Sequence, residues 1–154
     1  MINATIVLMI EETFTAYDIR AKLKAGASLE FAWNVGRALA EWLSTTGSVV
    51  VARGQGADEE LVGAVIEGLR LQGRDVCDAG SRDKEGIVAL VQKAGYSGAV
   101  LVAYDQLTDE VTIELYKEEG HLLDSETGLR EIKELMNAGN FVPAAVKGDV
   151  TTLA

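Results

Sequence analysis

The fold is decided by residues 28–73, which read SLEFAWNVGRALAEWLSTTGSVVVARGQGADEELVGAVIEGLRLQG. Apolar residues first recur at helical spacing over 29–43. A wholly apolar run follows at 49–52, which is typical of a strand buried on both faces of a parallel sheet. A second helical pattern over 58–73 has acidic residues in its first turn and a glycine at its end. This segment predicts a helix–strand–helix unit of an α/β protein.

The same two patterns continue on both sides of this unit. Further strands are predicted at 1–10, 75–79, 99–103 and 111–116, and further helices at 87–94 and 125–137. The strands in the middle of the chain begin about 25 residues apart, which requires parallel crossover connections. The short polar turn before 111–116 instead predicts a hairpin.

We therefore expect one α/β domain over 1–154, built as a three-layer α/β/α sandwich. Its sheet should be mixed but mostly parallel, with the hairpin at one edge. Residues 1–13 are expected to form an N-terminal strand extension, and 142–154 a loose tail.

Composition excludes several classes of function. The 154 residues include 24 acidic and 14 basic side chains, a formal charge of −10, which opposes nucleic acid and anionic membranes as partners. One cysteine and one histidine exclude an internal disulfide and a two-histidine metal site. The apolar segment 1–10 lacks a basic n-region, and Glu11 follows it at once. We therefore interpret 1–10 as a strand and not a signal peptide, and we expect a cytoplasmic protein.

Ligands of open α/β sheets bind beyond the carboxyl ends of the strands, so the loops there are the candidate sites. The loop at 53–58, RGQGAD, contains a G-x-G turn, but Glu59 stands where a third glycine would be needed. Carboxylates at 58–60 would also repel a pyrophosphate at the start of the following helix. A tight turn is therefore favoured over a nucleotide site, and a flavodoxin-like nucleotide binder is the disfavoured alternative.

Two other loops carry cations that could hold an anion. Arg82 and Lys84 lie in 80–85 among mixed charges, where a solvated surface is the favoured interpretation. Arg20 and Lys22 could form a phosphate clamp, because a guanidinium holds phosphate through a bidentate fork. The alternative for Arg20 is a structural contact with Asp18, and the residues alone leave both open.

The remaining reactive side chains favour structural roles. In the loop 104–109 no nucleophile–base pair is visible, so Tyr104 is expected to pack and Asp105 to cap the turn. Cys77 should be a buried apolar residue of its strand, and His121 a surface group. Trp33 and Trp42 fall on the first predicted helix, where packing is favoured over ligand binding.

Several motifs nevertheless resemble one known family. FTAYDIRAK at 14–22 is similar to the F-x-x-YDIRG-K opening of the α-D-phosphohexomutases, the superfamily of bacterial phosphomannomutases and phosphoglucomutases. The similarity continues in order through AWNVGRA, EGL, GRDVCDAG and DSETGLREI at 32–38, 67–69, 73–80 and 124–132. The resemblance implies the N-terminal domain I alone, an α/β/α domain that carries the phosphorylated serine in that family.

The active-site loop departs from the family pattern. The family reads T-A-S-H-N-P-x-x-Y-N-G-x-K where this chain reads VAYDQLTDEVTIE at 102–114. Tyr104 then replaces the phosphorylated serine, Asp105 the histidine and Glu114 the lysine. The resemblance thus implies no catalytic residue and leaves only Arg20 and Lys22 as phosphate-binding candidates. The family's Mg²⁺ is not expected to bind, because the serine phosphate that helps to hold it is lost and its D-G-D-x-D-R loop belongs to another domain.

These departures predict a stand-alone homologue of domain I without mutase activity, with a binding or regulatory role. A surface that faces other domains in the family would then be covered by a second copy or a protein partner. One alternative is a phosphosugar-binding component that uses Arg20 and Lys22 together with separately encoded domains. Another is a fragment of a longer mutase.

Overall fold

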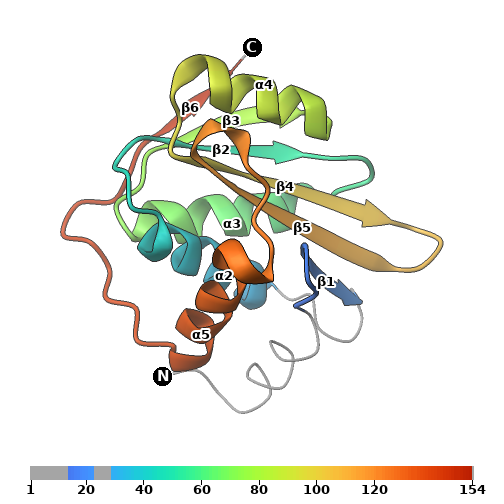
Figure 1. The fold of residues 1–154 in the computed structure, drawn as a ribbon, viewed down its shortest axis with the longest axis horizontal. Coiled ribbons are helices and arrows are strands. Elements are labelled where there is room, and N and C mark those ends of the chain that lie inside the picture. The colour runs from blue at the N-terminus through green and yellow to red at the C-terminus, as the bar shows by residue number, and fades with distance from the viewer. Residues whose placement is uncertain (1–13, 23–28, 154) are drawn as a thin grey trace.

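The computed structural model describes residues 14–22 and 29–153, which form a six-stranded mixed sheet flanked by helices (Figure 1). The strand order is β1-β5-β4-β2-β3-β6. β2 pairs in parallel with β3 and β4, and β3 with β6, whereas β5 is antiparallel to both β4 and β1. The strands are β1 (Ile19–Lys22), β2 (Val49–Arg53), β3 (Val76–Ser81), β4 (Gly98–Asp105), β5 (Glu110–Lys117) and β6 (Val150–Thr152). The extension predicted over 1–13 lies outside the described residues.

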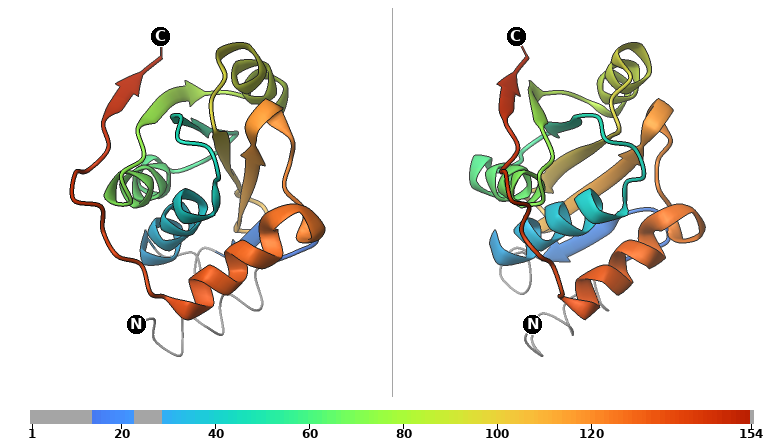
Figure 2. Two further views of the ribbon diagram at one scale, coloured as in Figure 1. Left: turned by 60° about the vertical axis from the view of Figure 1, so that its left-hand side comes forward. Right: turned by 90° about the vertical axis from the view of Figure 1, so that its left-hand side faces the viewer.

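Helices cover both faces of the sheet, which confirms the predicted three-layer α/β class. α2, α3 and α5 pack on one face and α4 on the other (Figures 1 and 2). The helices are α2 (Leu29–Trp42), α3 (Glu59–Leu71), α4 (Lys84–Ala94) and α5 (Arg130–Ala138), with short helical turns at η1 (Glu118–Gly120) and η2 (Ser125–Leu129). None of the described helices has the length and apolarity that crossing a bilayer requires.

β2 is apolar at successive positions because both of its faces are buried. Val49 and Val51 pack with the core under α2 and α3, while Val50 and Ala52 pack with the core under α4. All four side chains are fully buried, because successive residues of a strand point to opposite faces and both faces are covered. The strand therefore ties the two cores together.

The helix pair α2 and α3 meets at closely packed backbone. A Cβ at Gly36 would overlap the carbonyl oxygen of Val65, and a Cβ at Gly68 would overlap the carbonyl oxygen of Trp33. Each helix thus contributes one glycine, at the position where the other helix's backbone comes close. Side chains there would force the helices apart and open the core beneath them.

The C-terminal segment differs from the loose tail predicted over 142–154. Its last residues form β6 beside β3, so the sheet extends by one strand. Before β6, Arg70 Nε donates to the Gly148 carbonyl oxygen at 2.8 Å, and Lys147 lies 2.9 Å from Glu67. Because all three residues of β6 are exposed, the strand has no alternating apolar pattern that sequence reasoning could detect.

The other residues singled out from the sequence have structural roles. Cys77 is buried in β3, as predicted, and His121 is exposed. Trp33 lies against the Arg37 guanidinium, with 4.6 Å from ring centroid to Cζ, and Trp42 Nε1 donates to a carboxylate of α5. The tryptophans therefore serve helix packing.

The glycine contact between α2 and α3 gives a prediction about stability. We expect Gly68→Ala to lower the free energy of unfolding by about 1–3 kcal/mol, because its methyl group meets backbone that cannot move aside cheaply. The matched control is Gly63→Ala on the same helix, where a Cβ meets no atom within 4 Å. That control should raise stability by about 0.5–1 kcal/mol through helix propensity. Urea denaturation measures both, and equal effects of the two variants would contradict the close approach.

Candidate functional site at the carboxyl ends of the strands

Tyr104 lies in a regularly paired strand. β4 continues through Tyr104, which pairs with Val111 of β5, and its backbone N–H donates to the Gln55 carbonyl oxygen at 3.0 Å. The ring packs partly buried against the core under α2 and α3, as the sequence predicted. The hydroxyl donates to Asp109 Oδ1 at 2.7 Å, and this carboxylate raises the pKa of the Tyr104 phenol. The phenol therefore keeps its proton and points at a carboxylate of its own hairpin.

The turn between β4 and β5 is fixed by side-chain hydrogen bonds. Asp105 Oδ1 accepts from the Leu107 N–H at 2.9 Å, which confirms the predicted cap. Asp109 has a φ of 55°, a left-handed conformation that Asp and Asn tolerate better than most residues. Lys22 Nζ donates to the Thr108 carbonyl oxygen at 2.6 Å. Lys22 therefore holds the turn in place.

Arg20 lies in a strand and not in the loop expected over 17–22. β1 pairs antiparallel with β5, with Arg20 opposite Thr112. Arg20 Nε lies 3.0 Å from Asp18 Oδ1, and Nη1 lies 3.8 Å from Glu110. Of the two interpretations left open by the sequence, the structure shows the contact between Asp18 and Arg20. That ion pair raises the pKa of Arg20, chiefly through its hydrogen bond.

The strand register separates Arg20 from Tyr104. Arg20 lies opposite Thr112, and Thr112 lies opposite Ala103, so these three side chains share one face of the sheet. Tyr104 is the next residue along β4 and therefore points to the other face. Lys22 follows Arg20 by two residues in β1, so it points to the same face, where it lies opposite Glu110 of β5. The predicted phosphate-binding pair and the predicted serine position thus do not converge on one ligand.

The face that carries Arg20 and Lys22 is rich in carboxylates. Glu114, where the family has its lysine, acts on Arg20 from the same face, and Glu114 Oε1 accepts a hydrogen bond from Tyr116 at 3.2 Å. The carboxylates on or beside this face are those of Asp18, Asp105, Glu110 and Glu114. They outnumber the two cations of this face, and two of them, Asp18 and Glu110, lie within ion-pair distance of Arg20.

No cluster of metal-ligating side chains stands out in the part of the chain that the structure describes. Mg²⁺ takes hard oxygen ligands, usually carboxylates and phosphate oxygens, in octahedral geometry. Among residues 14–22 and 29–153, no group of three or more His, Cys, Asp or Glu is placed to hold a metal. The nearest carboxylate to the Tyr104 hydroxyl is Asp109, and it accepts the phenolic hydrogen.

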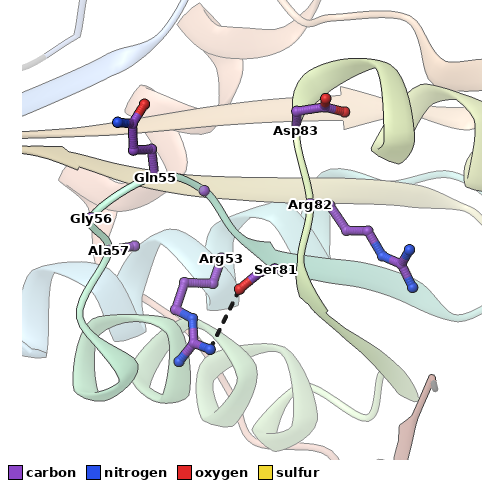
Figure 3. A pocket seen from close by; sticks show the side chains of 8 residues that line it. Arg53, Gln55, Gly56, Ala57, Ser81, Arg82 and Asp83 are labelled. Atoms are coloured by element: carbon purple, nitrogen blue, oxygen red, sulfur yellow. Dashed lines mark hydrogen bonds between the residues drawn. The ribbon is translucent and has the colours of Figure 1, made fainter.

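The carboxyl ends of β2, β3 and β4 border several cavities, two of which share residues of the β2–α3 loop. One, of about 430 Å³, lies between the β2–α3 and β3–α4 loops and is lined by 53–57 and 81–83 (Figure 3). The other, of about 520 Å³, shares Gln55 and Gly56 with it and reaches Tyr104 at the hairpin. Of the cations predicted in this region, Arg82 lines the first cavity and Lys84 begins α4.

Sequence reasoning considered the loop 53–58 as a nucleotide turn and set it aside, and it assigned no role to Arg53, which lines this first cavity. Arg53 Nη1 lies 2.6 Å from Glu59 Oε1, and Nη2 lies 3.5 Å from Ser81 Oγ. Asp58 caps α3 by accepting from the Glu60 N–H at 2.7 Å, as a tight turn would require. The available signal was an arginine directly between a buried strand and a glycine, at the sheet edge where ligands bind.

The Tyr104 hydrogen bond gives a spectroscopic prediction. We expect Asp109→Asn to lower the pKa of Tyr104 toward its ordinary value, because the variant removes the negative charge that opposes ionisation. Asn keeps the left-handed turn accessible, so the hairpin should remain folded. Ultraviolet titration of tyrosinate measures the change, and Tyr104→Phe identifies the transition. An unchanged titration in Asp109→Asn would mean that the hydroxyl is not bound to this carboxylate.

Known proteins share both the sequence pattern and the fold. The family model described as phosphoglucomutase/phosphomannomutase, alpha/beta/alpha domain I, matches residues 11–143. Phosphomannomutases of Salmonella typhimurium and Escherichia coli are 33% identical over 84% of this chain, which spans 29% of their length. A phosphomannomutase of Klebsiella pneumoniae is 31% identical, with 84% of this chain and 83% of that protein covered.

The architecture is also found in a solved structure. A phosphoglucomutase/phosphomannomutase family protein from Burkholderia thailandensis superposes with a TM-score of 0.73 at 22% identity, over 99% of this chain and 33% of that one. This structural likeness shows the fold. The family match and the Klebsiella relative show to which family the chain is related. The chain therefore belongs to the phosphoglucomutase/phosphomannomutase family, as a homologue of its α/β/α domain I.

Proposed function

We propose that this chain is a noncatalytic homologue of phosphohexomutase domain I, which acts by binding, in a regulatory or ligand-binding role. One observation carries the proposal. Tyr104 stands where the resemblance places the phosphorylated serine, and its hydroxyl donates to Asp109 at 2.7 Å within a paired hairpin. The hydrogen bond to Asp109 fixes the proton of this hydroxyl, and the paired strand fixes the position of the side chain.

Three physical arguments support the loss of phosphoryl transfer. A phenolic oxygen lies several ångströms farther from the backbone than a serine oxygen, whereas reactive geometry tolerates about 1 Å of misplacement. A phenol is also a better leaving group than an alcohol, which makes a phosphoryl group on Tyr104 less stable. Glu114 reverses the charge of the lysine that the resemblance places there, which removes a cation from the phosphate. The family's Mg²⁺ is accordingly not part of the proposed function.

A protein partner, or a second copy of this chain, is part of the proposal. Leu107 at the hairpin tip is 97% exposed, and Tyr17 beside β1 is 63% exposed. Leu107 lies at the end of the molecule that carries the altered active-site loop, whereas Tyr17 lies farther along β5, because β1 pairs Lys22 with Glu110 and Ile19 with Ile113. A partner on the hairpin end would bury Leu107, and light scattering that shows only monomer, with no partner bound at the hairpin, would count against it.

A second candidate is a phosphosugar-binding component that acts with separately encoded domains or belongs to a longer mutase. The observation that favours it is the presence of Arg20 and Lys22 on one face, both exposed, at positions that match the family motif. In that case a hexose phosphate should bind more weakly to Arg20→Gln. The acidic side chains around Arg20 make this the less favoured candidate.

The proposed function predicts the outcome of a mutase assay. With mannose 1-phosphate or glucose 1-phosphate, a hexose bisphosphate and Mg²⁺, we expect no 6-phosphate to form, because Tyr104 stands where the resemblance places the serine that carries the phosphoryl group. The Escherichia coli phosphomannomutase serves as the positive control. Mass spectrometry of the recovered chain should show no phosphoryl group on Tyr104. Turnover by the chain alone, or a stable phosphotyrosine at that position, would refute the proposal.

A further inference from the structure

The first cavity lies where the chain topology leaves a crevice. β2 and β3 are parallel neighbours, but the helix after β2, α3, packs on one face of the sheet, while the helix after β3, α4, packs on the other. Connections that diverge in this way leave an opening beyond the strand ends, where open α/β sheets bind ligands. A shallow cavity of about 430 Å³, widely open to solvent, occupies that opening.

Arg53 and Ser81 both line this crevice as neighbours on adjoining strands, and Figure 3 shows the contact between their side chains. Arg53 is the last residue of β2 and Ser81 the last of β3, and they are paired in the sheet register. The distance of 3.5 Å from Nη2 to Oγ is at the outer limit of a hydrogen bond, so this contact is weak. An oxyanion between the two groups would accept shorter hydrogen bonds from both, because guanidinium and hydroxyl are donors.

The backbone around these donors is already fixed. The Arg82 N–H donates to the Arg53 carbonyl oxygen at 3.1 Å, which joins the two loops directly. The Gly54 N–H donates to the Val102 carbonyl oxygen at 2.7 Å. Gly56 has a φ of +74°, and a Cβ there would lie 2.5 Å from the Tyr104 carbonyl oxygen. A ligand would therefore bind without first ordering the loops, which lowers the entropic cost of binding.

The carboxylates nearby direct an anion to Arg53 and not to a helix end. Asp58 and Asp83 cap α3 and α4, and their oxygens accept from the Glu60 and Gly86 N–H groups at 2.7 and 2.8 Å. Both helix N-termini are thus occupied. In contrast, the Glu59 side chain that pairs with Arg53 is 81% exposed, and it lines a neighbouring cavity of about 310 Å³ that Arg53 also borders. An exposed ion pair of this kind contributes little to stability, so another oxyanion can displace Glu59.

Arg82 has a more distant role. Its guanidinium points away from Arg53, and its Nε donates to the Ala79 carbonyl oxygen at 3.0 Å (Figure 3). It therefore adds positive potential to one wall of the crevice without closing on the same ligand atom. The specific contacts to an anion rest with Arg53 and Ser81.

We propose that this crevice binds the phosphate group of a small phosphorylated metabolite, with Arg53 as the main donor, Ser81 as the second donor and Glu59 as a built-in competitor. A planar guanidinium matches the paired oxygens of a phosphate. The organic part of the ligand would extend along the loop toward Gln55, which also lines the cavity. The site is separate from Arg20 and Lys22, and it deepens the binding role proposed above, on which it rests.

Calorimetry and amide NMR on the full chain test this site with inorganic phosphate, glycerol 3-phosphate, glucose 6-phosphate and unphosphorylated glucose. We expect binding of the two phosphate monoesters, with amide shifts centred on 54–57 and 81–82. Arg53→Gln should raise the Kd at least tenfold and Ser81→Ala severalfold. Glu59→Gln should lower the Kd severalfold, because it removes the competitor, and Arg20→Gln should leave the Kd unchanged. Circular dichroism and the apparent Tm confirm that each variant is folded.

Three results would overturn the site. The first is no binding of either monoester at millimolar concentration by wild type and Glu59→Gln. The second is binding that Arg20→Gln abolishes and Arg53→Gln does not, which would place the ligand on the β1 face. The third is a response to inorganic phosphate alone, which would exclude a metabolite. Failure of the proposed function is distinguishable, because it would show as turnover in the mutase assay whatever these Kd values are.

Discussion

The antiparallel ladder between β4 and β5 is the constraint on which the rest of the site depends. It runs through Tyr104 and Asp105 and is closed by the hydrogen bond from the Tyr104 hydroxyl to Asp109. Because the ladder is regular, successive side chains alternate between the two faces of the sheet. Tyr104 is thereby directed toward the core under α2 and α3, and the cations of β1 are directed to the opposite face. A loop with the same residues would carry no such restriction.

Charge acts together with this geometry. The resemblance to the family implies a cationic environment for phosphate. In this chain, however, carboxylates pair with a cation on the face that carries Arg20 and Lys22, because Asp18 and Glu110 contact Arg20. Lys22 is bonded to a carbonyl oxygen of the turn. At the crevice between β2 and β3, in contrast, the partner of Arg53 is an exposed glutamate. The anion site that we propose therefore lies beside the position of the family's phosphorylated serine, at the ends of the parallel strands β2 and β3.

Sequence patterns predicted the parts of the fold that depend on local burial. The apolar run Val49–Ala52 predicted a strand covered on both faces, and the turn before 111–116 predicted the hairpin. They could not predict β1 and β6, because these short outer strands exist through pairing with residues far away in the sequence. For the same reason the opposite orientation of Arg20 and Tyr104 was not predictable, since it follows from the register between β1, β5 and β4. Arg53 was overlooked because its significance depends on Ser81, which follows it by 28 residues.

The most direct test of this account is NMR of the hairpin in the full chain. The account predicts strong cross-strand contacts between the backbones of Tyr104 and Val111 and slow exchange of the Tyr104 amide hydrogen, because that amide donates to the Gln55 carbonyl oxygen. Averaged chemical shifts, rapid amide exchange and no contact between the two strands at these residues would contradict it. They would mean that Tyr104 belongs to a mobile loop, where its side chain could reach the ligands of an active mutase.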